Sequence, residues 1–448
     1  METNSELLMN SQVPLKEKLS FSMALFGQNI LYTFVNFYIM IFYTDKLGIS
    51  AAAAGTLFLI ARIWDAVNDL FMGNIVDKTR TRWGKCRPYL LIMPVPIAVS
   101  TVLLFVVPDL SYTGRLVYAY VTYILWDMLY TTVDIPIWTL SGRMSTDSDE
   151  RKTLISFGRV FSTFGSVVPI LLTIPLKDEL GGGNDALGYL LSIAFFCALG
   201  VPLMIQSAFN TRERADTPKD EKPTVMENVR AVVTNVPLLL MLASGLLGVL
   251  TFLPMVGIMY FATYNLGDEK YMMILAGLNL ASMALGCAAV PLFTRWFSGK
   301  ALFIGSSLLA SVFSAMFFFI GYGNLPLVYV FTFVIGVLWG FPMVLRTSMM
   351  ADTIEYIQLR TGKRSEGTIF STLTFMGKIN MGLGNFIAGI VLTVSGYVPN
   401  AVQSPGSLTG ILMIMTLLPG IGALLTIIPV FFFKLTEDKH REITERLG

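Results

Sequence analysis

The sequence predicts an all-α membrane protein with twelve transmembrane helices in two six-helix bundles. Of its 448 residues, 54% are hydrophobic and 14% charged, whereas about a quarter of a soluble domain is charged. Apolar stretches of bilayer length recur along the whole chain, and Lys and Arg gather in alternate loops. Lipid must therefore be much of the solvent around this chain.

Each apolar stretch is long enough for a transmembrane helix, which takes roughly 17–25 residues. The expected spans are 20–43, 52–75, 89–107, 114–140, 154–176, 187–208, 236–262, 271–294, 301–321, 326–350, 369–395 and 408–434. No cleavable signal peptide is expected before the first span. The longest polar segment predicts an N-terminal bundle over 1–209, a cytoplasmic middle loop over 210–235, and a C-terminal bundle with a short cytoplasmic tail over 236–448.

The distribution of basic residues predicts the orientation. With both termini in the cytoplasm, 24 of the 32 Lys and Arg residues face inward, four lie in outer loops and four lie within spans. Basic residues are enriched in cytoplasmic loops. The expected location is the bacterial cytoplasmic (inner) membrane, with many passes and both termini inside.

Several function classes are disfavoured. The net charge of +2 gives no reason to expect a nucleic-acid partner, and the three cysteines are scattered. The one histidine, His440, lies in the polar tail, so a zinc site or a histidine-based catalytic centre is not expected. We expect no enzyme and no resident cofactor.

Ionisable residues inside the spans mark the candidate site, since such groups usually face a bundle interior or a water-filled path. The embedded groups are Arg62, Asp65, Asp69, Asp127, Asp134, Arg159, Arg346 and Lys378. At roughly 1.5 Å per residue, five helices place polar groups in one slab about 10 Å thick. Arg346 is counted close to the cytoplasmic end and is expected to snorkel there.

Asp65 and Asp69 are four residues apart and share one helix face. With Asp134 at similar depth, these carboxylates repel one another unless a positive charge intervenes. Na⁺, Li⁺ or a proton would supply that charge, and Thr131 offers a hydroxyl oxygen one turn from Asp134. The alternative is a static salt-bridge network between helices.

The other embedded residues have two interpretations each. Arg62 and Asp127, at equal depth, are favoured as a structural pair. Lys378 is either a coupling charge or a counter-ion, and Arg159 a substrate or gating residue. Tyr130 and Trp138 flank Asp134 at one turn each; they either stack on a sugar or pack against other helices and lipid.

The loop between the second and third spans is a candidate gate. Gly73-x-x-x-Asp77 is followed by a basic run, and Asp77 can accept hydrogen bonds from helix-end amides. Asp352, after the tenth span, is a possible counterpart. The alternative for both acids is an ordinary solvated helix end.

Several motifs resemble those of one transporter family. The motifs are Gly73-x-x-x-Asp77-Lys78, Tyr43-Thr-Asp-x-x-Gly48, Ala61-Arg-Ile-Trp-Asp65-Ala-x-Asn-Asp69, Arg82-Trp-Gly-Lys85-x-x-Pro88, Tyr130-Thr-x-x-Asp134-Ile-Pro-x-Trp138, Met350-Ala-Asp352 and Gly396-Tyr-Val-Pro-Asn400. The first motif resembles the one that the major facilitator superfamily has between its second and third helices. Together they resemble the glycoside–pentoside–hexuronide:cation symporter family, which includes the bacterial melibiose permease, over nearly the full length.

The resemblance implies roles for particular residues. It places Asp65, Asp69, Thr131 and Asp134 in a cation site and Lys378 close to it. A sugar site would contain Tyr130, Asp134, Trp138 and Arg159, with Gln28 and Asn29 where a melibiose-type carrier has a Lys-Asp pair. Arg62, Asp77, Lys378 and Asp352 are the expected coupling and gating residues.

Two departures affect the expected substrate. Gln28-Asn29, and Met343 in place of a tryptophan, make a galactoside doubtful, and the Asn is similar to glucuronide and pentoside carriers. We expect a monomeric symporter of a glycoside, pentoside or hexuronide with Na⁺, Li⁺ or H⁺, working by alternating access. The alternative is a carrier of a lysolipid or another small molecule with the same fold.

Overall fold

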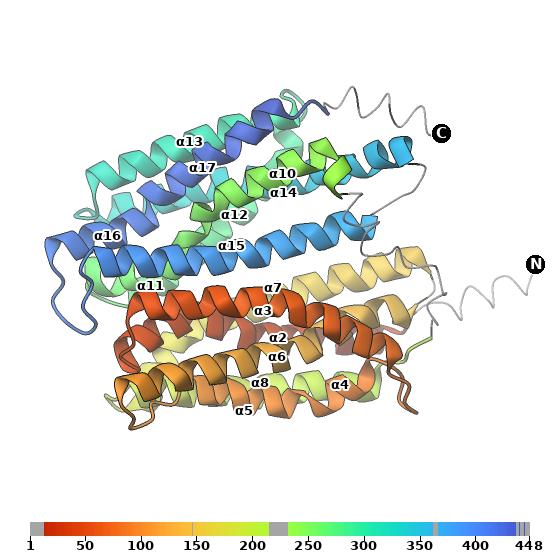
Figure 1. Ribbon diagram of the computed structural model, residues 1–448, viewed down its shortest axis with the longest axis horizontal. Coiled ribbons are helices and arrows are strands. Elements are labelled where there is room, and N and C mark those ends of the chain that lie inside the picture. The colour runs from red at the N-terminus through yellow and green to blue at the C-terminus, as the bar shows by residue number, and fades with distance from the viewer. Residues whose placement is uncertain are drawn as a thin grey trace, which may run out of the picture. The chain divides into compact units, whose positions relative to one another are not determined.

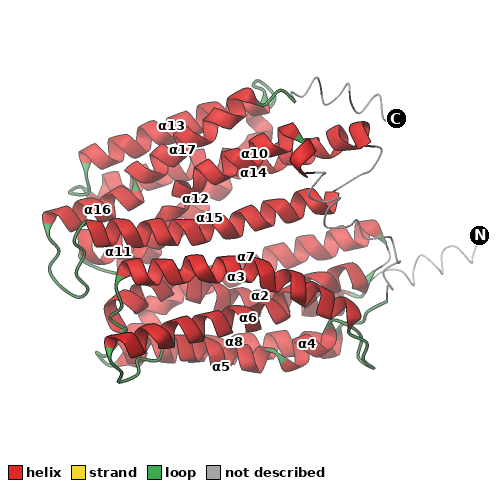
Figure 2. Ribbon diagram, in the orientation of Figure 1, coloured by secondary structure: helices red, strands yellow, loops and turns green. Residues whose placement is uncertain are grey.

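The computed structural model describes residues 13–145, 147–214, 232–361 and 366–435, together with Lys439 and Ile443. In these ranges helices are joined by loops and turns (Figure 2). An isolated bridge pairs Thr81 with Gly84. The chain forms two compact units, residues 1–50 with 63–220 and residues 51–62 with 221–448.

The helices of the first half overlap the expected spans, with ends that differ by up to six residues, and Figure 1 shows their arrangement. They are α2 (Leu15–Ile41) with a π-helical turn η1 (Phe42–Lys46), α3 (Ala51–Lys78), α4 (Arg87–Ile92), α5 (Pro94–Leu104), α6 (Tyr112–Met144), α7 (Ser148–Gly181) and α8 (Asp185–Asn210). The third span is broken at Pro94, because proline lacks the amide hydrogen that would continue the helix. Within this unit α2 packs along α7 and α8.

The second half contains more broken helices, and its longest, α14, has 37 residues. They are α10 (Val236–Leu247), a 3₁₀ turn η2 (Gly248–Phe252), α11 (Leu253–Tyr260), a π-helical turn η3 (Phe261–Asn265), α12 (Lys270–Phe293), α13 (Gly299–Ile320), α14 (Leu325–Thr361), α15 (Glu366–Val394), α16 (Pro405–Met415) and α17 (Leu417–Phe432). The first part of α3, residues 51–62, groups with this unit. There the Ala52 amide donates to Thr393 Oγ1 of α15 at 3.1 Å.

The predicted fold class is confirmed. In the described part of the chain, nine helices are long and apolar enough to cross a membrane. The helices α3 and α6 are not among them, although each is long enough, and both carry the embedded acids. The two helices that carry the embedded acids are therefore outside the set that length and apolar composition identify.

A hydrogen-bonded ion pair joins the start of α2 to the chain after α8. Arg214 Nη2 lies 2.6 Å from Glu17 Oε1, and its Nη1 donates to Glu17 Oε2 at 2.8 Å. Glu17 is only 8% exposed. The bond to Glu17 raises the pKa of Arg214 above its ordinary value, so this guanidinium stays charged over the whole working range of pH.

Replacing Arg214 by Ala is expected to destabilise the folded carrier by about 1–3 kcal/mol, because it leaves a mostly buried carboxylate without its charged donor. Thermal unfolding of the purified protein would show this as a lower midpoint. Arg214→Lys, which keeps the charge and loses the planar fork, should fall in between. An Arg214→Ala midpoint equal to that of the wild type would show that the pair contributes nothing.

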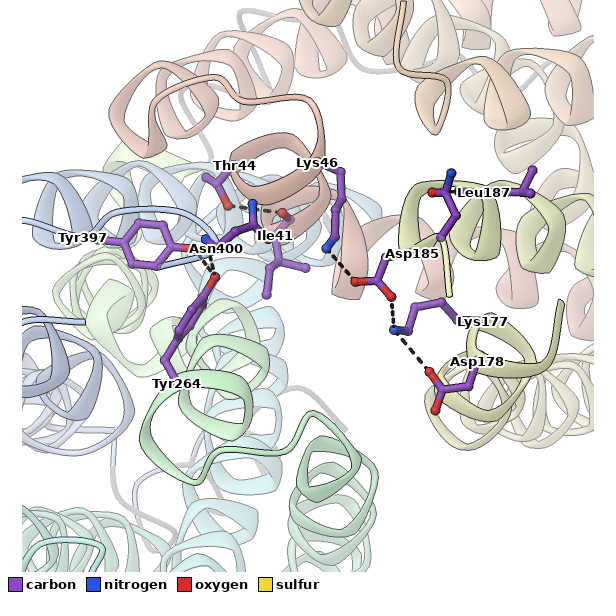
Figure 3. A network of polar contacts seen from close by, with 11 residues as sticks. Ile41, Thr44, Lys46, Lys177, Asp178, Asp185, Leu187, Tyr264, Tyr397 and Asn400 are labelled. Carbon is purple, nitrogen blue, oxygen red and sulfur yellow. Dashed lines mark hydrogen bonds and ion pairs between the residues drawn. The ribbon is translucent and has the colours of Figure 1, made fainter. Parts of the chain in front are cut away.

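Figure 3 shows the polar contacts at the other end of α2. Lys46 Nζ lies 2.7 Å from Asp185 Oδ2, and the nearly buried Lys177 lies 2.8 Å from Asp185 Oδ1. In the second unit the Tyr264 hydroxyl accepts from the Tyr397 hydroxyl and from the Asn400 amide, both at 3.1 Å. These contacts fasten the helix ends within each unit, η1 to α7 and α8 in one and η3 to the chain after α15 in the other.

Candidate functional site

The core of the candidate site is a carboxylate and a hydroxyl from two helices of the first unit. Thr131 Oγ1 on α6 lies 3.2 Å from Asp65 Oδ1 on α3, and 3.0 Å from the backbone oxygen of Asp127. Asp65 and Thr131 are each 3% exposed. A hydroxyl group has one hydrogen to donate and two lone pairs that can accept. When the Thr131 hydroxyl donates its hydrogen to the Asp127 backbone oxygen, the Thr131 oxygen is a second acceptor atom beside the Asp65 carboxylate.

The other embedded acids lie near this pair in sequence. Asp69 lies one turn beyond Asp65 and is partly exposed, whereas Asp127, one turn before Thr131, is 3% exposed. Across the described residues, His, Cys, Asp and Glu side chains form no group of three that could hold a metal ion. The structure brings the Asp65 carboxylate together with the Thr131 hydroxyl.

Asp134 on α6 accepts a hydrogen bond from another helix, α2. The spacing of residues along α6 could not reveal this contact. Gln28 Nε2 on α2 donates to Asp134 Oδ1 at 2.8 Å, and Gln28 is 2% exposed. The Gln28 Oε1 atom is buried and has no hydrogen-bond partner in the structure. Buried acceptors are almost always satisfied, so this oxygen is a ready acceptor for a hydroxyl of a bound molecule.

Asn29 connects the same part of α2 to α7. Its Nδ2 donates to the Leu25 carbonyl at 2.9 Å, and its Oδ1 accepts from Ser166 Oγ at 3.5 Å. These bonds fix the amide orientation, so Asn29 and Gln28 face different partners although they are adjacent in sequence.

Aromatic rings lie beside the polar groups. The Trp138 ring lies 4.4 Å from Cζ of the exposed Arg159, a cation–π geometry. The Tyr130 ring lies 5.2 Å from Tyr32 and 5.4 Å from Trp126. Tyr32 was missed in the sequence, although it lies four residues after Gln28 on the same face of α2. Which rings meet depends on helix packing, which one sequence does not reveal.

The remaining predicted residues are placed elsewhere. Arg62, which is 4% exposed, groups with the second unit, as do Asp352 on α14 and Lys378 on α15, both partly exposed. The Asp77 side chain lies outside the part of the chain that the structure describes. The structure therefore joins Asp65 to Thr131, Asp134 to Gln28, and Arg159 to Trp138, all within the first unit.

Comparison with known proteins agrees with this fold. The family model described as "MFS/sugar transport protein" matches residues 20–437. The isoprimeverose transporter of Lactiplantibacillus pentosus is 33% identical, over 98% of this chain and 93% of its own. The glucuronide carrier protein homolog of Escherichia coli (strain K12) is 30% identical, over 97% and 96%.

A solved structure shows the same fold at low sequence identity. The crystal structure of nucleoside transporter NupG matches 93% of this chain and 99% of its own, with a TM-score of 0.67 and 14% identity. The family match covers nearly all of the helical part of the chain. The chain therefore belongs to the MFS/sugar transport protein family, whose members are multi-pass membrane transporters of the major facilitator superfamily and not enzymes.

Proposed function

We propose that the chain is a secondary active symporter that carries a glycoside, pentoside or hexuronide across the cytoplasmic membrane together with Na⁺, Li⁺ or H⁺. The observation that carries this proposal is the buried Asp65 carboxylate beside the Thr131 hydroxyl, 3.2 Å apart in an apolar bundle. Carboxylate and hydroxyl oxygens are the kind of ligand that small hard cations take. An ionisable residue inside a membrane bundle is characteristic of an ion or proton path, so we assign this pair of oxygens to a co-transported cation.

In the proposed cycle, the cation binds to the Asp65 carboxylate and the Thr131 oxygen, with Asp69 within one turn to assist. Its charge offsets that of Asp65. One sugar hydroxyl then donates a hydrogen bond to Gln28 Oε1, and others donate to Asp134. The sugar ring stacks on the Trp138 ring, which Arg159 helps to orient. Lys378 would act as a coupling charge. With both ligands bound, the carrier would change from outward-facing to inward-facing. Both termini would stay in the cytoplasm throughout.

The names of the two relatives support the proposed substrate class, since isoprimeverose is a glycoside and a glucuronide is a hexuronide. The experiment that tests the proposal uses proteoliposomes containing the purified carrier and a panel of labelled glycosides, pentosides and hexuronides. An inward gradient of Na⁺, Li⁺ or H⁺ should drive at least one of them above its external concentration. Equilibration without accumulation under all three gradients would refute symport.

Trp138→Ala is expected to weaken sugar binding roughly thirtyfold, since an aromatic face and its stacked guanidinium each contribute of order 1 kcal/mol and about 1.4 kcal/mol is a factor of ten. Trp138→Phe keeps a ring in place and should lose less. Equilibrium binding of a transported sugar to the purified variants measures the difference. Equal affinities of the wild type and the alanine variant would exclude Trp138 from the sugar site.

A further inference from the structure

A second polar site lies inside the second unit. A pocket of about 300 Å³ opens among η2, α12, α13, α14 and α17. Its walls are mostly apolar, and include Phe252, Met283 and Met343. Two side chains of α14, Trp339 and Arg346, also line it. They are seven residues apart, so they share one face of the helix two turns apart.

Both α14 side chains present hydrogen-bond donors that have no acceptor. Arg346 Nε and Trp339 Nε1 are buried without a hydrogen-bond partner. These atoms can only donate, and buried donors are rarely left unpaired. The Ser307 hydroxyl on α13 lies in the same wall. The pocket thus offers donors that match a ligand rich in acceptors.

Arg346 also has no counter-charge in the described part of the chain. The structure records no ion pair for it, and its aromatic contact is with the Phe303 ring, 5.7 Å from Cζ. The residues that line the pocket include no Asp or Glu. A guanidinium in an apolar wall is costly when unpaired, so an acceptor from outside the protein would be bound tightly here.

Arg346 lies in the interior of α14, far from both helix ends. The tenth span was predicted to end at 350, but α14 continues to Thr361, which places Arg346 well inside the helix. Its Nε is buried and its side chain lines the pocket. The arginine is therefore available to a ligand in this pocket.

We infer that this pocket binds the carboxylate of a sugar acid, with Arg346 pairing with that carboxylate and Trp339 donating to it. This inference rests on the proposed transport of sugars and narrows their class to sugar acids and their glycosides. A planar carboxylate matches the fork of a guanidinium. The corresponding neutral sugar, with a hydroxymethyl group in place of the carboxylate, would leave the charge of Arg346 uncompensated.

The test compares sugars that differ only in this group. The probes are the p-nitrophenyl β-D-glucuronide and β-D-galacturonide, each beside its uncharged glucoside or galactoside, bound at equilibrium to the full-length carrier in detergent. The wild type should bind at least one acid about tenfold or more tightly than its neutral partner. Arg346→Gln should abolish that preference, Arg346→Lys should keep part of it, and Trp339→Phe should reduce it by a smaller factor.

Met343→Ala is the matched control, because Met343 lines the same pocket without charge. It should weaken both members of a pair equally. The Arg346→Met variant shows whether Arg346 is needed for folding. Removing an unpaired buried charge should leave the unfolding temperature of the ligand-free carrier unchanged or raise it. A clearly lower temperature would identify Arg346 as a structural residue and overturn the inference.

Binding and transport are measured in separate experiments, so either proposal can be refuted without the other. A wild type that binds no acid more tightly than its neutral partner, or an Arg346→Gln variant that keeps the preference, overturns the anion pocket and leaves sugar symport standing. An acid preference that depends on Arg346, in a carrier that no cation gradient drives, supports the pocket and refutes symport.

Discussion

Replacing Asp65 by Asn should abolish cation-dependent uptake while leaving a folded carrier in the membrane. Asn has the same shape and can still accept the hydrogen bond from Thr131, so packing is preserved, but it carries no charge to attract a cation. Coupling between two ligands is typically about 5–150-fold, and all of it should disappear. Initial uptake with and without Na⁺ or Li⁺, and at two pH values, measures the loss.

Neighbouring variants separate coupling from general damage. Asp69→Asn should also lower cation-dependent uptake. Asp127→Asn should reduce stability more than cation dependence, because Asp127 was interpreted as a structural partner. Thr131→Val, which removes an oxygen and keeps the shape, should weaken the cation affinity and retain some coupling. Normal stimulation by every cation in Asp65→Asn would eliminate the proposed cation site.

The second large effect is expected at the close approach of α12 and α14. A Cβ atom built on Gly340 would lie 2.5 Å from the Met283 carbonyl oxygen and 2.6 Å from the Cys287 amide nitrogen. Gly286, across the same contact, would overlap with the Val337 carbonyl. These are backbone atoms, which cannot turn aside. Small residues allow such close helix contacts in membranes.

Gly340→Val should therefore cost about 3 kcal/mol or more and sharply reduce the yield of monodisperse carrier. Gly277→Val on α12 is the control, because a Cβ atom there meets nothing within 4 Å. Size-exclusion profiles and unfolding midpoints of both variants give the comparison. Similar behaviour of the two variants would show that helix contact at Gly340 is looser than the structure describes.

The helices could be predicted from hydropathy because bilayer thickness sets the length of an apolar stretch. Helix ends could be predicted less well. After residue 350 the chain becomes polar while α14 continues to Thr361, since hydropathy reports where lipid ends and not where the helix ends. The pocket at Arg346 was missed because its walls come from five elements that are far apart in the sequence.

The site was predictable only within single helices. Helical spacing put Asp65 and Asp69 on one face, and Thr131 within a turn of Asp134. The contacts of Asp65 with Thr131 and of Gln28 with Asp134 join residues 66 and 106 positions apart. Such pairings depend on which helix faces meet, and that information is in the packing of all six helices of the unit and not in local spacing.

The most direct test of cation-coupled sugar transport is reciprocal binding at equilibrium. The dissociation constant of a transported sugar is measured with and without saturating Na⁺, Li⁺ or H⁺, at constant ionic strength, and that of the cation with and without the sugar. Symport through Asp65 predicts that each ligand tightens the other by the same factor, and that Asp65→Asn brings the factor to one. Sugar binding that no cation alters in the wild type would contradict the proposal.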